Sequence, residues 1–394
     1  MKAVILAAGE GKRLRPFTET MPKVMIPVAN KPILEYVFDA VKKNRIDEII
    51  VVVGYKKEVI MEYFKNYEDI KITYVVQDKQ LGTGHALLQT KKHIKESFIV
   101  LPGDNIIDQS SISALIKDKS KYSIIIKEHP HPSKYGVVFV EKNTLKKIVE
   151  KPKEEVGKFI STGIYKFPKT IFGDLDNMAS QGVYALSSFV QSIVNKGEEI
   201  STITANLWMD IVYPWDLLHL NEVMIHNTSS SIGGIIEKGV ITKGGVVIGK
   251  GTVIRSGCYV VGPVVIGNNC EIGPNSCIFP STTIGDNCVI NPFSEIKNSI
   301  IMDNVRINSN SLISHSIIGR GIILGNNFSN IVGKATIEVE GEFTKLNKIG
   351  TMIGEDCILK SHVVVDPGII VGRKCEIGSI SRIAKNIPSK SNVM

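Results

Sequence analysis

Long hydrophobic runs are absent from this 394-residue sequence, and aromatic residues make up only 7% of it. No run approaches the 18 apolar residues of a membrane-spanning helix. The apolar stretch at the N-terminus has seven residues and ends in a glycine turn, so it is too short for a secretory signal and has no cleavage site. We therefore expect a cytoplasmic location.

Two other patterns are missing. The six cysteines form no C-x-x-C pair, which argues against a zinc site. The net charge is +8, but no basic stripe is interleaved with aromatic residues, so no nucleic-acid partner is expected. A composition of 43% hydrophobic and 22% charged residues is typical of a folded protein, and the length predicts two domains.

Strand and helix signals alternate through about the first 225 residues, which predicts an α/β domain with a mostly parallel sheet covered by helices on both faces. The predicted strands are 3–7, 48–53, 72–76, 98–101, 123–126 and 136–140. The predicted helices are 33–44, 57–67, 84–94 and 111–118, and a further helix, 215–226, is expected to close the domain. A linker is predicted at 227–234.

From about Ile236, aliphatic residues recur at every sixth position. They are Ile248, Ile254, Val260, Ile266, Ile272, Ile278, Ile284, Ile290, Ile296, then after one-residue slips Ile301, Ile307, Ile313, Ile318 and Leu324, and finally Ile353, Leu359, Val365, Val371, Ile377 and Ile383. This repeat predicts a parallel β-helix of triangular coils, and it resembles the left-handed β-helix of hexapeptide acyltransferases. The predicted domains are 1–227, with a Rossmann-like mixed sheet, and 235–394, a left-handed parallel β-helix.

Five cysteines follow a repeat aliphatic by four residues, where other repeats carry Thr or Ser, so we expect them to be small inward-facing packing residues. Residues Gly325–Gly350 break the register and are interpreted as an excursion from the coil that contacts a neighbouring subunit. Because the faces of such solenoids self-associate, a homo-oligomer is expected, and the resemblance makes a trimer the first hypothesis.

A glycine turn rich in cations follows the first predicted strand. Gly9-x-Gly11 is followed by Lys12, Arg13 and Arg15 and, after Pro22, by Lys23. Glycines expose backbone N–H groups that bind anions, and four cations nearby suit a triphosphate. The turn has neither the G-x-x-x-x-G-K-[ST] pattern of a Walker loop nor the third glycine and ribose-binding acid of a dinucleotide fold.

The string from Val4 to Glu35 resembles the signature of the sugar-1-phosphate nucleotidylyltransferases, L-A-A/G-G-x-G-x-R-L-x-P-x-T…P-K…P-V…K-P. The resemblance implies that backbone groups of the loop hold the base and phosphates, and that Arg13 and Lys23 lie on the triphosphate and the transferred phosphoryl group. The loop residues concerned are Leu6, Ala7, Ala8, Gly9 and Gly11.

Two aspartates are candidate metal ligands. Asp104 ends the apolar strand 98–101 through Pro-Gly-Asp, and ligands bind at strand ends in α/β sheets. In the family the matching aspartate holds Mg²⁺, which prefers one or two carboxylates plus phosphate oxygens. Trp208-Met-Asp210 resembles the family's W-x-D segment, whose aspartate reaches the same ion, whereas Asp216 is predicted to cap a helix.

The segment Gln77–Ala86 is predicted to hold the base. An amide side chain at Gln77 and the Gly82-Thr83 turn suit the hydrogen-bonding edge of a base. The string resembles the Q…Q-L-G-T-G-H-A of uridylyltransferases that use N-acetylglucosamine-1-phosphate, which favours UTP, with dTTP as the alternative. His85 is interpreted as a packing or capping residue.

Three further pieces resemble the family's sugar-phosphate motifs: Tyr135-Gly136-Val137, Glu150-Lys151-Pro152, and Ser161-Thr162-Gly163. They imply that Gly136, Glu150, Lys151 and Thr162 contact the sugar-1-phosphate, with Lys151 on its phosphate. N-acetylglucosamine-1-phosphate and glucose-1-phosphate are the expected acceptors.

Some two-domain relatives also carry an acetyltransferase in the β-helix, with a histidine base in an H-L-x-Y-x-G-D segment. Here Ser309 stands at that histidine, Leu312 at the tyrosine, and Ile323 at a downstream asparagine. His315 and His362 could in principle substitute, but both fall at repeat positions that tend to face outward as exposed scaffold histidines, so acetyl transfer is disfavoured. A non-catalytic nucleotide-sugar-binding paralogue is the alternative of a different class, and the intact Arg13, Lys23, Asp104 and Asp210 argue against it.

Overall fold

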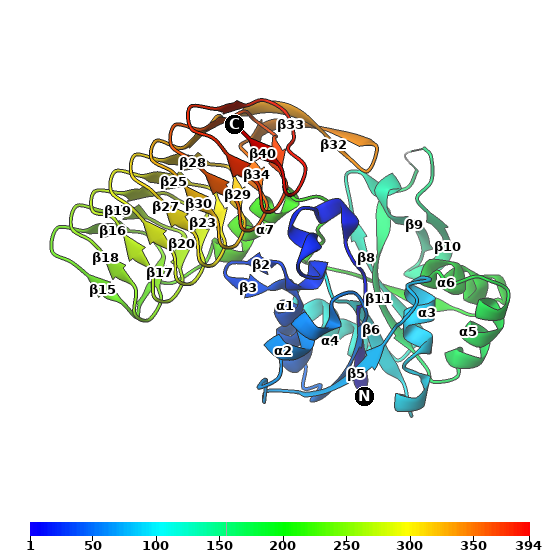
Figure 1. The fold of residues 1–394 in the computed structure, drawn as a ribbon. Helices are drawn as coiled ribbons and strands as arrows, with labels where there is room; N and C mark the ends of the chain where they lie inside the picture. Colours follow the sequence, from blue (N-terminus) through cyan, green and yellow to red (C-terminus); the bar gives the residue numbers. More distant parts are fainter. Residues whose placement is uncertain (155) are drawn as a thin grey trace. The chain divides into compact units, whose positions relative to one another are not determined.

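The computed structural model describes residues 1–154 and 156–394, and its contacts group them into two compact units (Figure 1). The first unit contains residues 1–10, 21–25 and 32–210. The second contains residues 11–20, 26–31 and 211–394. The predicted domain limits, 1–227 and 235–394, follow the sequence order and stay a prediction. In the described residues no helix is long and apolar enough to cross a bilayer.

A nine-stranded mixed sheet forms the centre of the first unit, in the order β5-β4-β1-β6-β11-β8-β12-β10-β9. Strands β1, β4, β5 and β6 run parallel, and β11 pairs antiparallel with β6 and β8. The strands are β1 (Lys2–Ala7), β4 (Glu48–Val53), β5 (Lys71–Val76), β6 (Phe98–Pro102), β8 (Tyr122–Glu128), β9 (Gly136–Glu141), β10 (Thr144–Glu150), β11 (Phe159–Phe167) and β12 (Ile200–Thr204). All six predicted strands are present, and the mixed α/β class is confirmed.

The helices of the first unit form two groups, α1 with α4 and α3 with α5 and α6 (Figure 1). They are α1 (Ile33–Lys42), α2 (Lys57–Tyr63), α3 (Thr83–Leu88), α4 (Gln109–Lys117), α5 (Ile171–Ser180) and α6 (Leu186–Asn195). The helix predicted at 84–94 is therefore shorter than expected. The Thr90 hydroxyl donates to the Leu87 carbonyl at 2.7 Å, a local bond that competes with the helical ladder.

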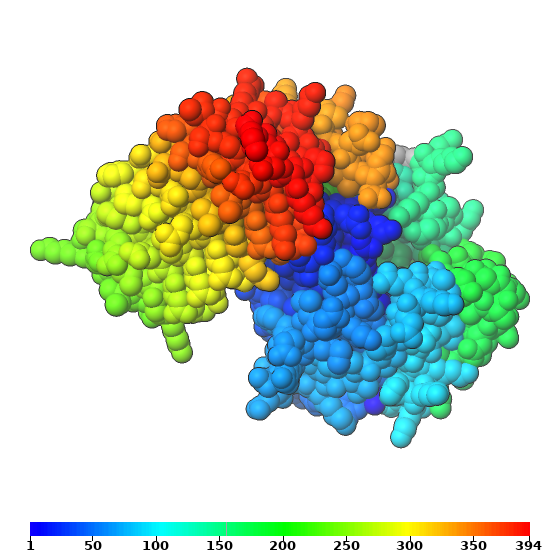
Figure 2. Space-filling model, in the orientation of Figure 1, coloured from blue at the N-terminus to red at the C-terminus, as the bar shows by residue number. Residues whose placement is uncertain are grey.

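The second unit is a parallel β-helix whose coils contribute strands to three sheets. The first sheet has β14 (Ser231–Ile232), β17 (Val246–Ile248), β20 (Val264–Ile266), β23 (Thr282–Ile284), β26 (Ile300–Ile301), β29 (Ile317–Ile318), β34 (Met352–Ile353) and β37 (Ile370–Val371). The second has β15 (Ile235–Ile236), β18 (Val253–Ile254), β21 (Glu271–Ile272), β24 (Val289–Ile290), β27 (Arg306–Ile307), β30 (Ile323–Leu324), β35 (Ile358–Leu359), β38 (Glu376–Ile377) and β40 (Asn392–Val393). The third has β16 (Ile241–Lys243), β19 (Tyr259–Val261), β22 (Cys277–Ile278), β25 (Glu295–Lys297), β28 (Leu312–Ser314), β31 (Ser329–Asn330), β36 (Val364–Val365) and β39 (Arg382–Ile383). Successive coils stack in chain order, from green through yellow to red in Figure 2.

The repeat aliphatics fill the coil interior, where each is at most 4% exposed. The small residues stack beside them: the Cys288 amide donates to Cys270 Sγ at 3.4 Å, and the Cys375 amide donates to Cys357 Sγ at 3.3 Å. Five cysteines are buried, as predicted, while Cys277 is half-buried. Many coil corners are asparagines with positive φ, a conformation that asparagine tolerates better than most residues.

Three sequence interpretations need correction in the second unit. The excursion begins after β31, because Phe328 and Asn330 are still buried in a coil, and it forms a hairpin of β32 (Gly333–Val339) and β33 (Glu342–Ile349). Helix α7 (Asp216–Ile225) groups with the coils, where the Asn221 side chain donates to the Ser281 carbonyl and accepts from the Thr283 hydroxyl. The predicted linker already contains β14, which pairs with β17.

Candidate active site

The residues that follow the parallel strands gather at one edge of the first unit's sheet. Leu6 is in register with Val52 and with Pro102, so Ala8, Gly54 and Gly103 follow neighbouring strand ends. The Gly103 amide donates to the Leu6 carbonyl at 2.8 Å, and a Cβ on Gly54 would lie 2.9 Å from the Ala8 carbonyl oxygen. Glycine is therefore required where these backbones converge.

Lys23 and Asp104 meet at this edge. The Lys23 ammonium, on the 3₁₀ turn Lys23–Met25, lies 2.5 Å from Asp104 Oδ2. Both side chains are partly accessible, at 18% and 28% exposure. Two residues that the sequence assigned to phosphate and metal binding, 81 positions apart, therefore form one ion pair.

A small antiparallel sheet brings Asp210 toward Asp104. Strand β13 (Trp208–Met209) pairs with β7 (Ile106–Ile107), with Met209 opposite Ile106. Asp210 directly follows Met209, and Asp104 lies two residues before Ile106, the residue opposite Met209. Both aspartates therefore follow or precede the same end of this two-stranded sheet. The Tyr135 hydroxyl donates to Asp210 Oδ1 at 2.8 Å and fixes that carboxylate.

These oxygens suit a hard divalent cation. Mg²⁺ is bound in proteins by one or two carboxylates together with substrate phosphates, and Asp104 and Asp210 supply that number. The described residues contain no cluster of three or more His, Cys, Asp or Glu side chains that could hold a metal without substrate. The donor set therefore fits an ion shared with a nucleotide, not a closed structural site.

The predicted base segment is held on both sides. The Gln80 amide donates to the Ala8 carbonyl at 2.8 Å, which ties the segment to the loop. The Gly84 amide donates to the Tyr184 carbonyl at 2.7 Å, and Thr83 Oγ1 accepts from the Leu186 amide at 3.0 Å. A Cβ on Gly82 would lie 2.7 Å from the same Tyr184 oxygen, so this glycine permits the close approach.

Two of the four sugar-phosphate candidates lie side by side. Gly136 pairs with Glu150 across β9 and β10, and a Cβ on Gly136 would lie 3.2 Å from Glu150 Oε2. Lys151 follows, exposed, with its amide donating to the Tyr135 carbonyl at 3.0 Å. Thr162 is 2% exposed, and its hydroxyl donates to the Ile125 carbonyl, while its own carbonyl accepts from the Asn105 amide.

Arg13 and Gly11 lie on the segment 11–20, which belongs to the second unit. Gly11 has a left-handed φ of 75°, and its carbonyl accepts from the Thr18 hydroxyl at 2.9 Å. Arg13 Nη2 lies 2.9 Å from Glu342 Oε1 of the β32–β33 hairpin, and the guanidinium lies 5.8 Å from the centroid of the Tyr213 ring. The Tyr213 hydroxyl donates to the other Glu342 oxygen.

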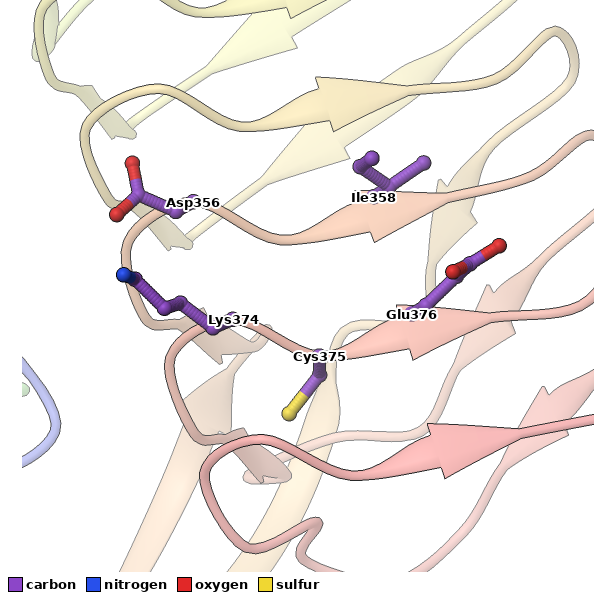
Figure 3. A pocket seen from close by; sticks show the side chains of 5 residues that line it. All are labelled: Asp356, Ile358, Lys374, Cys375 and Glu376. Atoms are coloured by element: carbon purple, nitrogen blue, oxygen red, sulfur yellow. The ribbon is translucent and has the colours of Figure 1, made fainter.

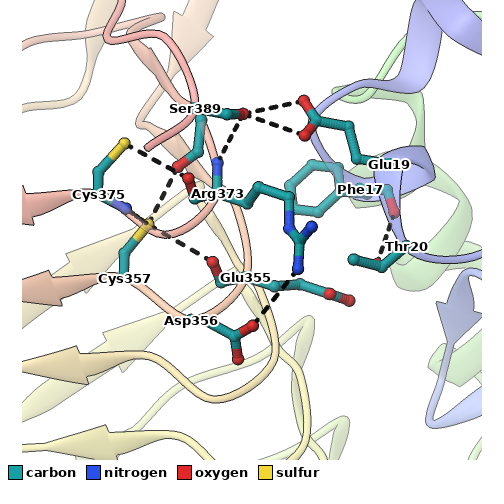
Figure 4. Close-up of polar contacts among 10 residues, drawn as sticks. Phe17, Glu19, Thr20, Glu355, Asp356, Cys357, Arg373, Cys375 and Ser389 are labelled. Carbon is teal, nitrogen blue, oxygen red and sulfur yellow. Dashed lines mark hydrogen bonds and ion pairs between the residues drawn. The ribbon is translucent and has the colours of Figure 1, made fainter. Parts of the chain in front are cut away.

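The same segment is anchored on the coils through its far end (Figure 4). The Ser389 hydroxyl donates to the Glu19 carboxylate at 2.9 Å, and the Ser389 oxygen accepts from the Arg373 amide. Glu355 is buried beside Thr20, and this burial raises the pKa of its carboxyl. The contact of the excursion with a neighbouring subunit stays a prediction, and within this chain the hairpin contacts the Arg13 segment.

The coil wall carries a shallow hollow of about 410 Å³ lined by Asp356, Ile358, Lys374, Cys375 and Glu376 (Figure 3). Its charges are mixed, with two acids and one base, so it offers no concentration of positive charge to a polyanionic cofactor. His362 is exposed, as predicted. His315 is not: it is 8% exposed, and burial, with Lys348 and Lys297 nearby, lowers its pKa to about 4.

Sequence reasoning named Tyr135 and His85 but not their contacts, and it missed Glu342 altogether. Tyr135 and Asp210 are 75 residues apart, and Arg13 and Glu342 are 329 apart, so no local pattern links them. The Q-L-G-T-G-H-A string did include His85, but its ring contacts with Gln77 and Gln89 depend on the fold.

The fold and the strand-end site define a class, the nucleotidyltransferases with an added left-handed β-helix. The nucleotidyl transferase family model matches residues 2–226, and the GMPPB C-terminal domain model matches residues 260–366. The chain belongs to the nucleotidyl transferase family, as a sugar-1-phosphate nucleotidyltransferase. The predicted resemblance is thereby confirmed, and enzymes of this family generally use a divalent metal such as Mg²⁺.

Some relatives match the chain over its full length, and others match only about half of it. It is 41% identical to the bifunctional protein GlmU of Methanococcus maripaludis strain C7, covering 100% of this chain and 97% of that protein. It is 37% identical to the UTP–glucose-1-phosphate uridylyltransferase AglF of Haloferax volcanii, covering 55% and 93%. A crystal structure of a putative glucose-1-phosphate thymidylyltransferase from Bacillus anthracis has the same fold over 57% of this chain and 94% of its own, with a TM-score of 0.53 and 23% identity.

Proposed function

We propose that the protein transfers UMP from UTP to an aldose-1-phosphate, giving a UDP-sugar and pyrophosphate, with Mg²⁺ as cofactor. N-acetylglucosamine-1-phosphate and glucose-1-phosphate are the favoured acceptors. The observation that carries the proposal is the Lys23–Asp104 ion pair at the strand ends, with Asp210 held at the same edge. AglF, named as a uridylyltransferase, supports UTP.

The reaction needs positioning and charge compensation more than proton transfer. An oxygen of the sugar-1-phosphate attacks the α-phosphorus of the nucleotide in line, a new P–O bond forms, and the bond to the β-phosphate breaks with pyrophosphate taking the electron pair. No general base is required because the attacking phosphate is already an anion. Asp104 and Asp210 would hold Mg²⁺, and the bound ion would compensate the negative charge of the phosphates.

The chain's own residues supply the remaining roles. Lys23, next to Asp104, would compensate the charge that develops on the transferred phosphoryl group, and Arg13 would bind the triphosphate. Lys151 would hold the acceptor's phosphate, while Glu150 and Gly136 would take sugar hydroxyls. The loop residues 6–9 and 11, with Gln77, Gly82 and Thr83, would hold the nucleotide.

For the second unit we propose an assembly role, with a trimer as the first hypothesis. Full-length relatives named bifunctional make acetyl transfer the second candidate. Against it stand Ser309, Leu312 and Ile323 in place of the expected groups, and the burial of His315. Robust release of coenzyme A from acetyl-CoA with glucosamine-1-phosphate would overturn the assembly-only proposal. A cytoplasmic location stays a prediction.

Pyrophosphate release should be measured with UTP, dTTP, CTP and GTP, each combined with several sugar-1-phosphates and Mg²⁺. The proposal predicts the highest kcat/KM for UTP with one of the two favoured acceptors. A preference for dTTP with glucose-1-phosphate would establish the alternative enzyme, and binding of nucleotide-sugar without turnover would establish the non-catalytic paralogue.

A further inference from the structure

We propose that the last coils of the β-helix take part in nucleotide binding, and that Ser389 is a positioning residue that holds Arg13 in place for the triphosphate. The inference rests on the proposed function, because it takes Arg13 as a phosphate-binding residue. The carrying observation is that the segment 11–20, which contains Gly11 and Arg13 of the glycine loop, is held by groups of the coils.

The segment 11–20 has little regular structure of its own. It contains two 3₁₀ turns, Lys12–Leu14 and Phe17–Glu19. Their backbone hydrogen bonds reach only three residues along the chain. Turns this short have poor hydrogen-bond geometry and do not persist in isolation. The position of the segment therefore depends on the groups that anchor it.

One internal bond lets the segment move as a unit. Thr18 is fully buried, and its hydroxyl donates to the Gly11 carbonyl at 2.9 Å, which ties the end of the segment to its beginning. The side chains of Leu14 and Phe17 are at most 1% exposed. Because Arg13 lies between the two tied residues, a displacement at one end of the segment is transmitted to Arg13.

The coils hold the far end of the segment (Figure 4). The Ser389 hydroxyl donates to the two carboxylate oxygens of Glu19, at 2.9 and 3.1 Å. Its oxygen accepts from the Arg373 amide at 3.1 Å, so the backbone of one coil orients the hydroxyl of the next. A Cβ on Gly354 would lie 2.9 Å from the Cβ of Pro16, so this part of the coil wall packs directly against the segment.

This anchor determines how well Arg13 can bind phosphate. A hydrogen bond to a carboxylate is stronger than one between neutral groups, so losing the Ser389 hydroxyl loosens the far end of the segment. A guanidinium binds phosphate oxygens through a planar fork of donors, and a misplacement of about 1 Å is enough to disturb that geometry. Ser389 therefore acts on the nucleotide through Arg13, and the β-helix contributes to substrate binding besides its proposed assembly role.

The test is the dissociation constant measured by titration calorimetry on the full chain, with Mg²⁺ and whichever of UTP, dTTP, CTP and GTP the wild type binds most tightly. Ser389→Ala and Glu19→Ala should each raise this constant about three- to tenfold. Glu19→Gln, whose amide oxygen can still accept from the Ser389 hydroxyl, should stay within about twofold of the wild type. Ser391→Ala is the matched control: it removes a hydroxyl that donates to the Pro388 carbonyl of its own coil, and it should leave the constant unchanged.

A double-mutant cycle shows whether Ser389 acts through Arg13. Arg13→Ala should weaken binding, and adding Ser389→Ala to it should change the dissociation constant by less than about twofold. A further weakening as large as in Ser389→Ala alone would assign Ser389 a general structural role and overturn the inference. An unchanged constant in Ser389→Ala, or in Arg13→Ala, would overturn it as well.

Thermal unfolding and the binding stoichiometry separate a misfolded fraction from a lower affinity in each variant. If Ser389→Ala does not fold, Glu19→Ala carries the same test from the other side of the bond. The readout is independent of turnover and of the identity of the base. If the wild type binds a triphosphate but releases no pyrophosphate, the proposed function fails while the inference stands.

Discussion

At the scale of single residues, the carboxyl group of Glu355 is buried by the fold. It is 5% exposed, and its Oε1 has no hydrogen-bond partner in the described residues. Burial raises its pKa in the folded state. The folded protein therefore binds the Glu355 proton more tightly than the unfolded chain does, and this contribution to stability is lost as the pH rises through the raised pKa.

Glu355→Gln should accordingly raise the unfolding temperature at pH 8 relative to the wild type, with the difference vanishing as the pH falls below the ordinary glutamate pKa. Thermal unfolding at a series of pH values measures this. Glu340→Gln, at an exposed position of the hairpin, is the matched control and should change little. A variant less stable than the wild type at pH 8 would contradict the prediction.

At the scale of elements, the sequence predicted what local periodicity determines. The strands of the first sheet and the coil interior follow from apolar spacing, because a six-residue repeat brings one large aliphatic side chain per coil face into the interior. Helix ends were less predictable, as the Thr90 bond that shortens α3 illustrates. Asp104 was predictable because it follows a buried strand, whereas the Tyr135–Asp210 bond was not, since it joins separate elements.

The coil interior gives a direct stability prediction. Ile307 on β27 is fully buried, and Ile307→Ala should lower the free energy of unfolding by about 2–5 kcal/mol, because it removes packed methyl groups and leaves a cavity. Ile235→Ala on β15, where the side chain is 63% exposed, should cost less than about 0.5 kcal/mol. Urea unfolding followed by circular dichroism compares them. Equal losses of unfolding free energy in the two variants would contradict the prediction that the repeat aliphatics point into the coil.

At the scale of the whole molecule, a residue of the nucleotide signature is bonded within the second unit. Arg13 pairs with Glu342, and both side chains are substantially exposed, at 37% and 53%. Such an exposed pair contributes at most about 1 kcal/mol. This link could not be predicted from sequence, since the hairpin's register break gives no indication of its partner.

Glu342→Ala should release Arg13 from this carboxylate and strengthen UTP binding by up to about fivefold, which corresponds to that small pair energy. Titration calorimetry measures the change, and Glu340→Ala on the same hairpin serves as the control. The prediction assumes that the Glu342 carboxylate and the nucleotide compete for Arg13. Weaker UTP binding in the variant would contradict it and would indicate that Glu342 orients Arg13 for the triphosphate.

The central claim is that the chain performs nucleotidyl transfer at the edge where Lys23 meets Asp104. Its most direct test is kcat for pyrophosphate release by Asp104→Ala and Lys23→Ala at saturating UTP, sugar-1-phosphate and Mg²⁺. Each variant should lose on the order of 10²–10³ in kcat, as when one preorganised stabiliser of transition-state charge is removed. Turnover near the wild-type rate in either variant would contradict the account.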